Sequence, residues 1–247
     1  MIKVLAIGNS FSSDATRYLY QIARADKVDM KVVNLFIGGC PLAYHYSNIF
    51  SEEKRYDFEF NGVSTGMKVS IKDGLLNESW GGWDFVTMQQ VSNMSIDFET
   101  FNPYIEELSE YVKKYSPKAK QFIHQTWAYE EGSKRLSEEL GYKNQLDMFC
   151  DIKSSYEKAA EKINASGIIP SGETLQNLIK EGLPVHRDSF HASLGLGRYA
   201  IALTWYEMLT GNSTENNTFR DFDVPVSEEE VKLAKKAAHE AVLKYRK

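Results

Sequence analysis

Short apolar runs alternate along this chain with longer amphipathic segments, and this order constrains the fold more than any other feature of the sequence. The runs that we predict as buried strands are residues 3–7, 30–37, 83–89, 120–125 and 167–170. The predicted helices are residues 14–25, 103–115, 144–165, 172–180, 194–209 and 227–245. Strands that alternate with helices form a parallel sheet covered on both faces. We therefore expect an α/β fold of three layers, α/β/α, around a central, mostly parallel five-stranded sheet.

One segment departs from this alternation. Residues 58–60 and 67–71 alternate apolar with polar side chains, and residues 61–66 separate them. We predict an antiparallel β-hairpin here, inserted at about residues 56–72 and placed at an edge of the sheet. No internal repeat and no linker rich in Pro, Gly or Ser divides the sequence, so we expect residues 1–247 to form one domain.

Small and polar residues follow the predicted strands at the points where ligand sites form in such folds. Ser10 follows the first strand, Gly38-Gly39 the second, residues 89–93 the third and residues 124–127 the fourth. In open parallel sheets, ligands bind beyond the carboxyl ends of the strands. These four groups should therefore meet along one rim of the sheet.

Charge and composition exclude several classes of partner. The formal net charge is −5 at pH 7 and no basic patch stands out, which argues against nucleic acid and anionic membranes as partners. No apolar run approaches the roughly 18 residues that a membrane-spanning helix needs. The N-terminal apolar run is too short for a signal peptide, so we expect a cytoplasmic protein, although a chain trimmed after export would look the same. Cys40 and Cys150 lack metal-site spacing and are predicted to be free thiols.

Ser10 lies in Gly8-Asn9-Ser10-Phe11, where the first strand is predicted to turn into a helix. A serine hydroxyl is a weak nucleophile until a base removes its proton. A strand-to-helix turn would expose the hydroxyl and direct amides of the helix N-terminus at a developing oxyanion. Serine is also a good helix N-cap, and Ser12, Ser13 and Asp14 compete for that position. The segment alone leaves both roles open.

His191 is the only one of the five histidines with an acidic residue, Asp188, three positions before it. Pro184 and the polar Arg187-Asp188-Ser189 predict a loop just before a helix, where this spacing can set both side chains on one side of a turn. The carboxylate could then orient the imidazole while its other nitrogen faces the serine. In the alternative interpretation, Asp188 is a helix N-cap and His191 a first-turn residue.

Taken together, these segments resemble a known family. Gly8-Asn9-Ser10-Phe11 is similar to the Gly-Asp-Ser-Leu block that opens the SGNH, or GDSL-type, esterases and lipases, with Asn9 in place of the usual Asp. Asp188-Ser189-Phe190-His191 matches the closing D-x-x-H block of that family. Residues 34–39 resemble the second block and residues 84–93 the third. The resemblance implies a flavodoxin-like three-layer fold and an uncharacterised bacterial branch of the superfamily.

The resemblance also implies a mechanism. Ser10 would attack an ester carbonyl, His191 would act as base and then as acid, and Asp188 would orient His191. The backbone N–H groups of Ser10 and Gly39 and the side-chain amide of Asn93 would form the oxyanion hole. No metal or cofactor is implied.

The third block is where the sequence departs most from the family. The usual Gly-x-Asn-Asp is replaced by Val91-Ser92-Asn93-Met94. The glycine of the family's turn is therefore missing, and the turn can differ in geometry from that of the family. Gln90 and then Gln89, at the end of the strand, are the alternatives to Asn93 as amide donor. A buried glutamine there could equally be structural.

Residues after the fourth strand bear on the substrate. His124, Trp127 and Tyr129 are the candidate substrate-binding residues, with core packing as the alternative for the aromatic pair and a hydrogen-bonded structural role for the histidine. Aromatic walls suit sugar rings or acyl chains. With the family analogy, they predict a small-molecule substrate, a short-acyl (acetyl) ester on a carbohydrate. A lipase or thioesterase acting on longer chains, and a non-catalytic ligand-binding protein, are the alternatives.

Overall fold

The computed structural model describes residues 1–76 and 81–246. Its centre is a seven-stranded sheet in the order β4-β3-β2-β1-β5-β6-β7. The strands are β1 (Ile2–Gly8), β2 (Met30–Phe36), β3 (Tyr56–Phe60), β4 (Val63–Val69), β5 (Phe85–Met88), β6 (Lys120–His124) and β7 (Gly167–Ile169). The strands β2, β1, β5, β6 and β7 run parallel, as predicted. The hairpin β3–β4 continues the same sheet antiparallel to β2, so the sheet is mixed and has seven strands rather than five.

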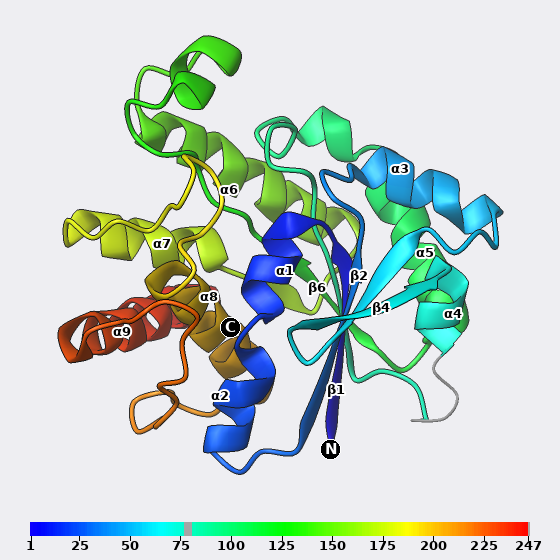
Figure 1. Cartoon of the computed structure of the whole chain (residues 1–247). Helices are drawn as coiled ribbons and strands as arrows, with labels where there is room; N and C mark the ends of the chain where they lie inside the picture. Colours follow the sequence, from blue (N-terminus) through cyan, green and yellow to red (C-terminus); the bar gives the residue numbers. More distant parts are fainter. Residues whose placement is uncertain (77–80, 247) are drawn as a thin grey trace.

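Helices flank the sheet on both sides (Figure 1). On one side lie α1 (Ser10–Thr16), α2 (Leu19–Ala25), α7 (Ser171–Lys180), α8 (Leu196–Thr210) and α9 (Glu228–Tyr245). On the other side lie α3 (Leu42–Ser47), α4 (Ile71–Leu76) and α5 (Tyr104–Tyr115). The helix α6 (Gln145–Lys162) packs against β6 and β7. Because both faces are covered, β1 is apolar throughout its centre, and its residues Val4, Leu5, Ala6 and Ile7 are buried.

The helix predicted over residues 14–25 is in fact two helices, α1 and α2, and the first begins at Ser10. The break falls at Arg17 and Tyr18, and both side chains are tied to the C-terminal part of the chain. Arg17 forms an ion pair with Asp223, and the Tyr18 hydroxyl donates to the carbonyl of Leu194 at 2.7 Å. These tertiary contacts fix the bend, which local propensity does not show.

The hairpin turn is shorter than the predicted loop of residues 61–66. Asn61 and Gly62 alone connect β3 to β4, with φ angles of 51° and 81°. Two consecutive positive φ angles are typical of the tight turns that match strand twist. A Cβ atom on Gly62 would lie 2.2 Å from the carbonyl oxygen of Arg17, so only glycine lets the turn approach the junction of α1 and α2.

The start of α9 and the two cysteines are as the sequence predicts. Ser227 and Glu230 form the capping box predicted at the start of α9. Cys40 and Cys150 are free thiols, as predicted. Within residues 1–76 and 81–246, no helix is both long and apolar enough to cross a lipid bilayer.

Candidate active site

Ser10 opens α1, directly beyond the end of β1. The N-cap of this helix is Asn9 and not Ser10, because the Asn9 side-chain oxygen accepts a hydrogen bond from the Phe11 N–H at 3.1 Å. The capping role that the sequence left open therefore belongs to the neighbouring residue. The Ser10 hydroxyl is free to face across the rim of the sheet.

That hydroxyl meets His191, which in turn meets Asp188. Ser10 Oγ lies 2.8 Å from His191 Nε2, and His191 Nδ1 lies 2.8 Å from Asp188 Oδ2. A carboxylate oxygen can only accept, so Nδ1 carries the proton, and the Nε2 lone pair accepts the Ser10 O–H. Asp188 Oδ1 also accepts from the His191 backbone N–H at 2.9 Å, which fixes the carboxylate relative to the ring. The structure thus brings together the three residues in the order that base-assisted serine chemistry requires.

Asp188 remains ionised well into the acidic range. Partial burial alone would raise the pKa of its carboxyl group, but hydrogen bonds from the His191 ring and backbone, with the charges of His191 and Arg187, lower the pKa below its usual value. A group whose pKa is lowered by folding stabilises the protein above its unfolded pKa and loses that effect as the pH falls. The hydrogen bond to His191 should therefore weaken only below about pH 4, the ordinary range of aspartate.

Both groups lie at the tip of a short segment, residues 185–193, which we call the His191 loop. An antiparallel bridge between His186 and Ala192 closes its base. Ser189, at the tip, has a φ of 71°, in the left-handed region that residues other than glycine rarely adopt. Its carbonyl accepts a hydrogen bond from the Glu130 N–H at 2.7 Å, which holds this strained residue in place.

The alternative interpretation of Asp188 as a helix N-cap is wrong. The helix that follows, α8, begins only at Leu196, and its N-cap residue is Gly195. Asp188 instead accepts from the backbone three residues ahead within a loop, a local turn that aspartate side chains commonly stabilise.

Trp127 supports the site from behind. Its indole N–H donates to the carbonyl of Phe190, in the His191 loop, at 2.8 Å. Its ring stacks on Phe11 with the centroids 4.1 Å apart and an interplanar angle of 5°. Since Phe11 follows Ser10 directly, one indole contacts both chain segments that carry the site.

The expectation that His124, Trp127 and Tyr129 line a substrate pocket needs correction. Their exposed fractions are 0%, 1% and 2%. His124 lies within β6 and packs against Trp205, while the chain that follows β6 is covered by the His191 loop. His124 Nδ1 donates to the side-chain oxygen of Gln89 at 2.6 Å, and His124 Nε2 accepts from the Ser171 hydroxyl at 3.0 Å. Burial lowers the pKa of His124 to about 3, so the ring is neutral. Packing and hydrogen bonding, rather than contact with a ligand, account for these side chains.

The backbone N–H groups of Ser10 and Gly39 are the two main-chain donors that the family resemblance implies for an oxyanion hole. Gly39, after β2, adopts a φ of 61°, and a Cβ there would touch nothing, so glycine serves the backbone conformation rather than close packing. Within the described part of the chain, neither the Gly39 N–H nor the Ser10 N–H donates a hydrogen bond.

The three candidate amides differ in what they already bind. The Gln90 oxygen accepts from the Leu42 N–H at 2.9 Å, and its amide nitrogen donates to the Thr100 carbonyl at 2.8 Å. Gln89 is hydrogen-bonded at both ends as well. Asn93 is exposed, and its side chain has no hydrogen bond to any residue that the structure describes. The side chains of both glutamines are thus already hydrogen-bonded within the described part of the chain, whereas that of Asn93 is not.

Asn9 connects the turn between β1 and α1 to the segment that carries Gly39. Its amide nitrogen donates to the Cys40 carbonyl at 3.1 Å, while its oxygen accepts from Phe11 and from Gln89. Asn9→Asp, which would restore the usual residue of the GDSL block, should lower the free energy of unfolding by about 1–3 kcal/mol, because a buried carboxylate would then face a carbonyl oxygen.

Urea unfolding measures this effect. Asn216→Asp, at an exposed position, is the matched control and should change stability by less than about 0.5 kcal/mol. Equal stability of Asn9→Asp and the parent protein would contradict the donor role of the Asn9 amide.

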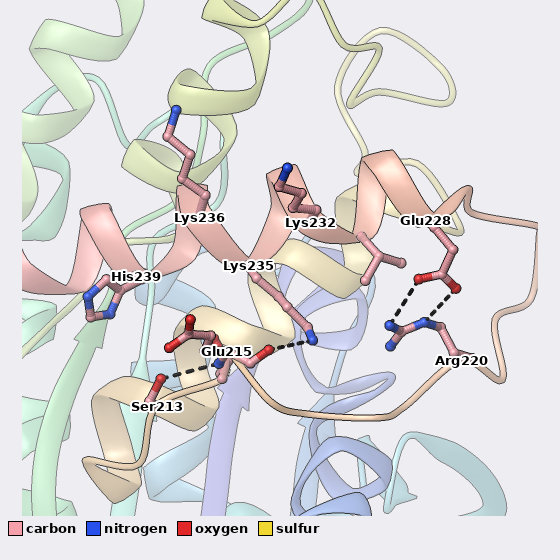
Figure 2. A pocket seen from close by; sticks show the side chains of 10 residues that line it. Ser213, Glu215, Arg220, Glu228, Lys232, Lys235, Lys236 and His239 are labelled. Atoms are coloured by element: carbon pink, nitrogen blue, oxygen red, sulfur yellow. Dashed lines mark hydrogen bonds and ion pairs between the residues drawn. The ribbon is translucent and has the colours of Figure 1, made fainter.

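Two cavities of the described part of the chain lie away from this rim. One of about 430 Å³ lies between α9 and the loop before it, where Arg220 pairs with Glu228 and Lys235 donates to the Glu215 carbonyl (Figure 2). A second, of about 750 Å³, lies beside β7. Neither is lined by the residues around Ser10. Across residues 1–76 and 81–246, no group of three or more His, Cys, Asp or Glu side chains is placed to hold a metal ion.

One buried acidic residue, Asp14, was considered from the sequence only as a possible N-cap. It lies four positions after Ser10, one helical turn away, and contacts the His191 loop through Arg187 and Ala192. Its spacing of four residues from Ser10 was the only hint in the sequence that Asp14 lies near the site. The partners of Asp14 are more than 170 positions away in the chain, and a local pattern cannot show them.

Comparisons with known proteins identify the family of this chain and the relatives of its fold. The model of a domain of unknown function, DUF4886, matches residues 3–241. A DUF4886 family protein from Bacteroides uniformis ATCC 8492 is 34% identical, with a TM-score of 0.89 over 98% of this chain and 95% of that chain. No curated protein matches the sequence.

More distant structures share the fold. A protein proposed to be an SGNH hydrolase, from Slackia heliotrinireducens, is 22% identical, with a TM-score of 0.57 over 83% of this chain and 97% of that chain. The psychrotrophic esterase EstA from Pseudoalteromonas sp. is 14% identical, with a TM-score of 0.51 over 84% of this chain and 94% of that chain. The similarity to the SGNH, or GDSL-type, fold that the sequence predicted is confirmed.

Proposed function

This chain belongs to the DUF4886 family, and we propose that it hydrolyses carboxylic esters through an acyl-enzyme formed on Ser10. One observation carries the proposal: the continuous line of hydrogen bonds from Asp188 through His191 to Ser10, with 2.8 Å at each side-chain link. A nucleophile bonded to a base, with the base oriented by a third group, is the geometry of activated serine. The similarity of this fold to that of an esterase and of a protein proposed to be an SGNH hydrolase is consistent with ester hydrolysis.

The reaction follows from the direction of these hydrogen bonds. As Ser10 Oγ attacks the ester carbonyl, His191 Nε2 takes the hydroxyl proton, and Asp188 stabilises the imidazolium that forms. The tetrahedral intermediate collapses, the C–O bond to the alcohol breaks, and His191 returns the proton to the departing oxygen. Water then attacks the acyl-Ser10 ester with His191 again as base, which releases the acid and restores the serine.

The developing oxyanion would be held by the N–H groups of Ser10 and Gly39 and by the Asn93 amide. None of these three donors forms a hydrogen bond to a residue that the structure describes, which supports this assignment. Asn93→Ala should lower kcat about 10²- to 10³-fold, because removal of one preorganised donor weakens binding of the transition state. The measurement is steady-state hydrolysis of p-nitrophenyl acetate, with Asn216→Ala as the exposed control. A kcat for Asn93→Ala within twofold of the parent's would assign the third donor elsewhere.

A short acyl group is the better substrate. In the described part of the chain, the large apolar side chains that are exposed are Met1, Tyr44, Phe50, Val63, Met67, Leu146, Val224 and Leu243. None lies in the segments that carry Ser10, Asn93 or the His191 loop, where apolar side chains such as Met94 and Phe190 are only partly exposed. This favours a short acyl group over a long chain. The carbohydrate part of the proposal rests on family analogy, since the buried Trp127 and Tyr129 no longer support it.

A panel of p-nitrophenyl esters from acetate to decanoate tests the proposal. We expect kcat/KM to be highest for acetate or propionate and to fall with chain length. A preference for octanoate or decanoate would overturn the short-acyl assignment in favour of a lipase or thioesterase. Failure to hydrolyse any ester would favour a non-catalytic ligand-binding protein. Release of acetate from an acetylated monosaccharide, compared with acetylated glycerol, tests the carbohydrate part separately.

A further inference from the structure

Asp14 is a carboxylate in the protein interior. It lies on α1, one helical turn after Ser10, and its side chain is 1% exposed. Removing a charge from water is costly unless partners replace the lost hydration. The partners of Asp14 therefore indicate what the fold gains from burying it.

Most of these partners belong to the His191 loop. Asp14 accepts hydrogen bonds from Arg187 Nη1 at 2.9 and 3.1 Å and from the Ala192 backbone N–H at 3.1 Å. It also accepts from Arg198 Nε, at the start of α8, at 2.8 Å. Arg187 additionally donates to the Ala192 carbonyl. One side chain on the nucleophile's helix thus holds the His191 loop on both sides of its tip.

Arg187 also faces the acid of the candidate triad. Its Nε lies 3.8 Å from Asp188 Oδ2, the oxygen that accepts from His191. An arginine without another anion would be drawn to Asp188 and would compete with His191 for that oxygen. Asp14 holds the guanidinium by a second, closer ion pair at 2.9 Å.

From these contacts we propose that Asp14 is a positioning residue. It fixes the His191 loop against α1, and it prevents Arg187 from pairing with Asp188 in place of His191. The catalytic meaning of this role rests on the proposed function. Asp14 acts through other residues, since its side chain bonds to Arg187, Ala192 and Arg198 rather than to Ser10 or His191. Ordinary stabilisation of the fold is the competing explanation, so the test needs a variant that removes a comparable ion pair without affecting the loop.

Asp223 provides that control. It pairs with Arg198 at 3.1 Å and with Arg17, both in the same charged network as Asp14. No hydrogen bond or ion pair joins Asp223 to the His191 loop in the part of the chain that the structure describes. Asp14→Asn and Asp223→Asn each remove one negative charge from this network at constant side-chain size.

Both variants are checked for folding by circular dichroism and then compared in two measurements. Hydrogen exchange with mass spectrometry reports the protection of the peptide that contains residues 185–193. Hydrolysis of p-nitrophenyl acetate reports kcat and KM. For Asp14→Asn we expect about tenfold faster exchange in this peptide and a 10- to 100-fold lower kcat with KM within about twofold, because small displacements of a catalytic group are costly. Asp223→Asn should leave both near the parent values.

The possible outcomes separate the two proposals. Unchanged exchange in Asp14→Asn, or equal losses of kcat in the two variants, would overturn the positioning role. If the parent protein hydrolyses no ester, the proposed function fails, and the exchange comparison alone decides whether Asp14 holds the loop. If Asp14→Asn does not fold, Arg187→Gln tests the same link from its other end and should loosen the same peptide.

Discussion

Replacement of Ser10 by alanine is expected to lower kcat for ester hydrolysis by about 10⁴-fold or more, the usual cost of removing the nucleophile of a serine triad. The hydroxyl oxygen is the atom that would form the bond to the substrate, and it lies 2.8 Å from the base. Because Asn9 rather than Ser10 caps α1, the free energy of unfolding should change by less than about 1 kcal/mol. Steady-state kinetics and urea unfolding on the same preparation measure the two effects.

Ser13→Ala is the matched control, since Ser13 lies on the same helix and donates to Glu59. It should keep kcat within about threefold of the parent's, as expected for a residue outside the chemistry. The double variant Ser10→Ala with His191→Ala should be no slower than Ser10→Ala alone, because members of a triad act as a unit. Substantial activity in Ser10→Ala would contradict the acyl-enzyme on Ser10.

The second large effect is expected in stability. Trp127→Ala should lower the free energy of unfolding by about 3–5 kcal/mol, because it opens a cavity beneath the rim. The ring is 1% exposed and stacked on Phe11. The substitution also removes the hydrogen bond to the Phe190 carbonyl, so kcat should fall together with stability. Urea unfolding and ester hydrolysis below the unfolding transition measure both.

Two conservative substitutions separate packing from the hydrogen bond. Trp127→Phe keeps much of the ring but loses the N–H, so it should cost about 1–2 kcal/mol and lower kcat. Trp205→Phe is the control: Trp205 is fully buried, and its indole N–H has no hydrogen-bond partner among the described residues. If Trp205→Phe lowers kcat as much as Trp127→Phe does, the anchoring role of the Trp127 N–H is contradicted.

The parallel core of the sheet could be predicted from the sequence because each buried strand is a short apolar run, as in β1. The meeting of Ser10, Gly39 and residues 89–93 along one rim could be expected because strand ends in a parallel sheet converge there. His191 follows no strand, and its place beside Ser10, 181 positions away, was expected from its spacing to Asp188 and from the resemblance to the D-x-x-H block. Periodicity and topology are enough for the sheet, whereas the site also needed the family resemblance.

Other features depend on contacts that no local pattern shows. The bend between α1 and α2 is set by partners of Arg17 and Tyr18 far along the chain. Trp127 was expected beside a substrate and is buried, since a sequence does not show that the His191 loop covers it. The sequence left open which amide would complete the oxyanion hole, because the hydrogen bonds of Gln89 and Gln90 are made to residues far along the chain or in other loops.

Covalent labelling by a fluorophosphonate bears most directly on Ser10 as the nucleophile, because such probes phosphonylate an activated serine far faster than an ordinary one. Native protein should gain the mass of one label, and digestion should place it on the peptide that contains Ser10. His191→Ala should label far more slowly, and Ser10→Ala should not label. A native protein that does not react, or a Ser10→Ala variant that labels as fast as the parent, would contradict the assignment of Ser10.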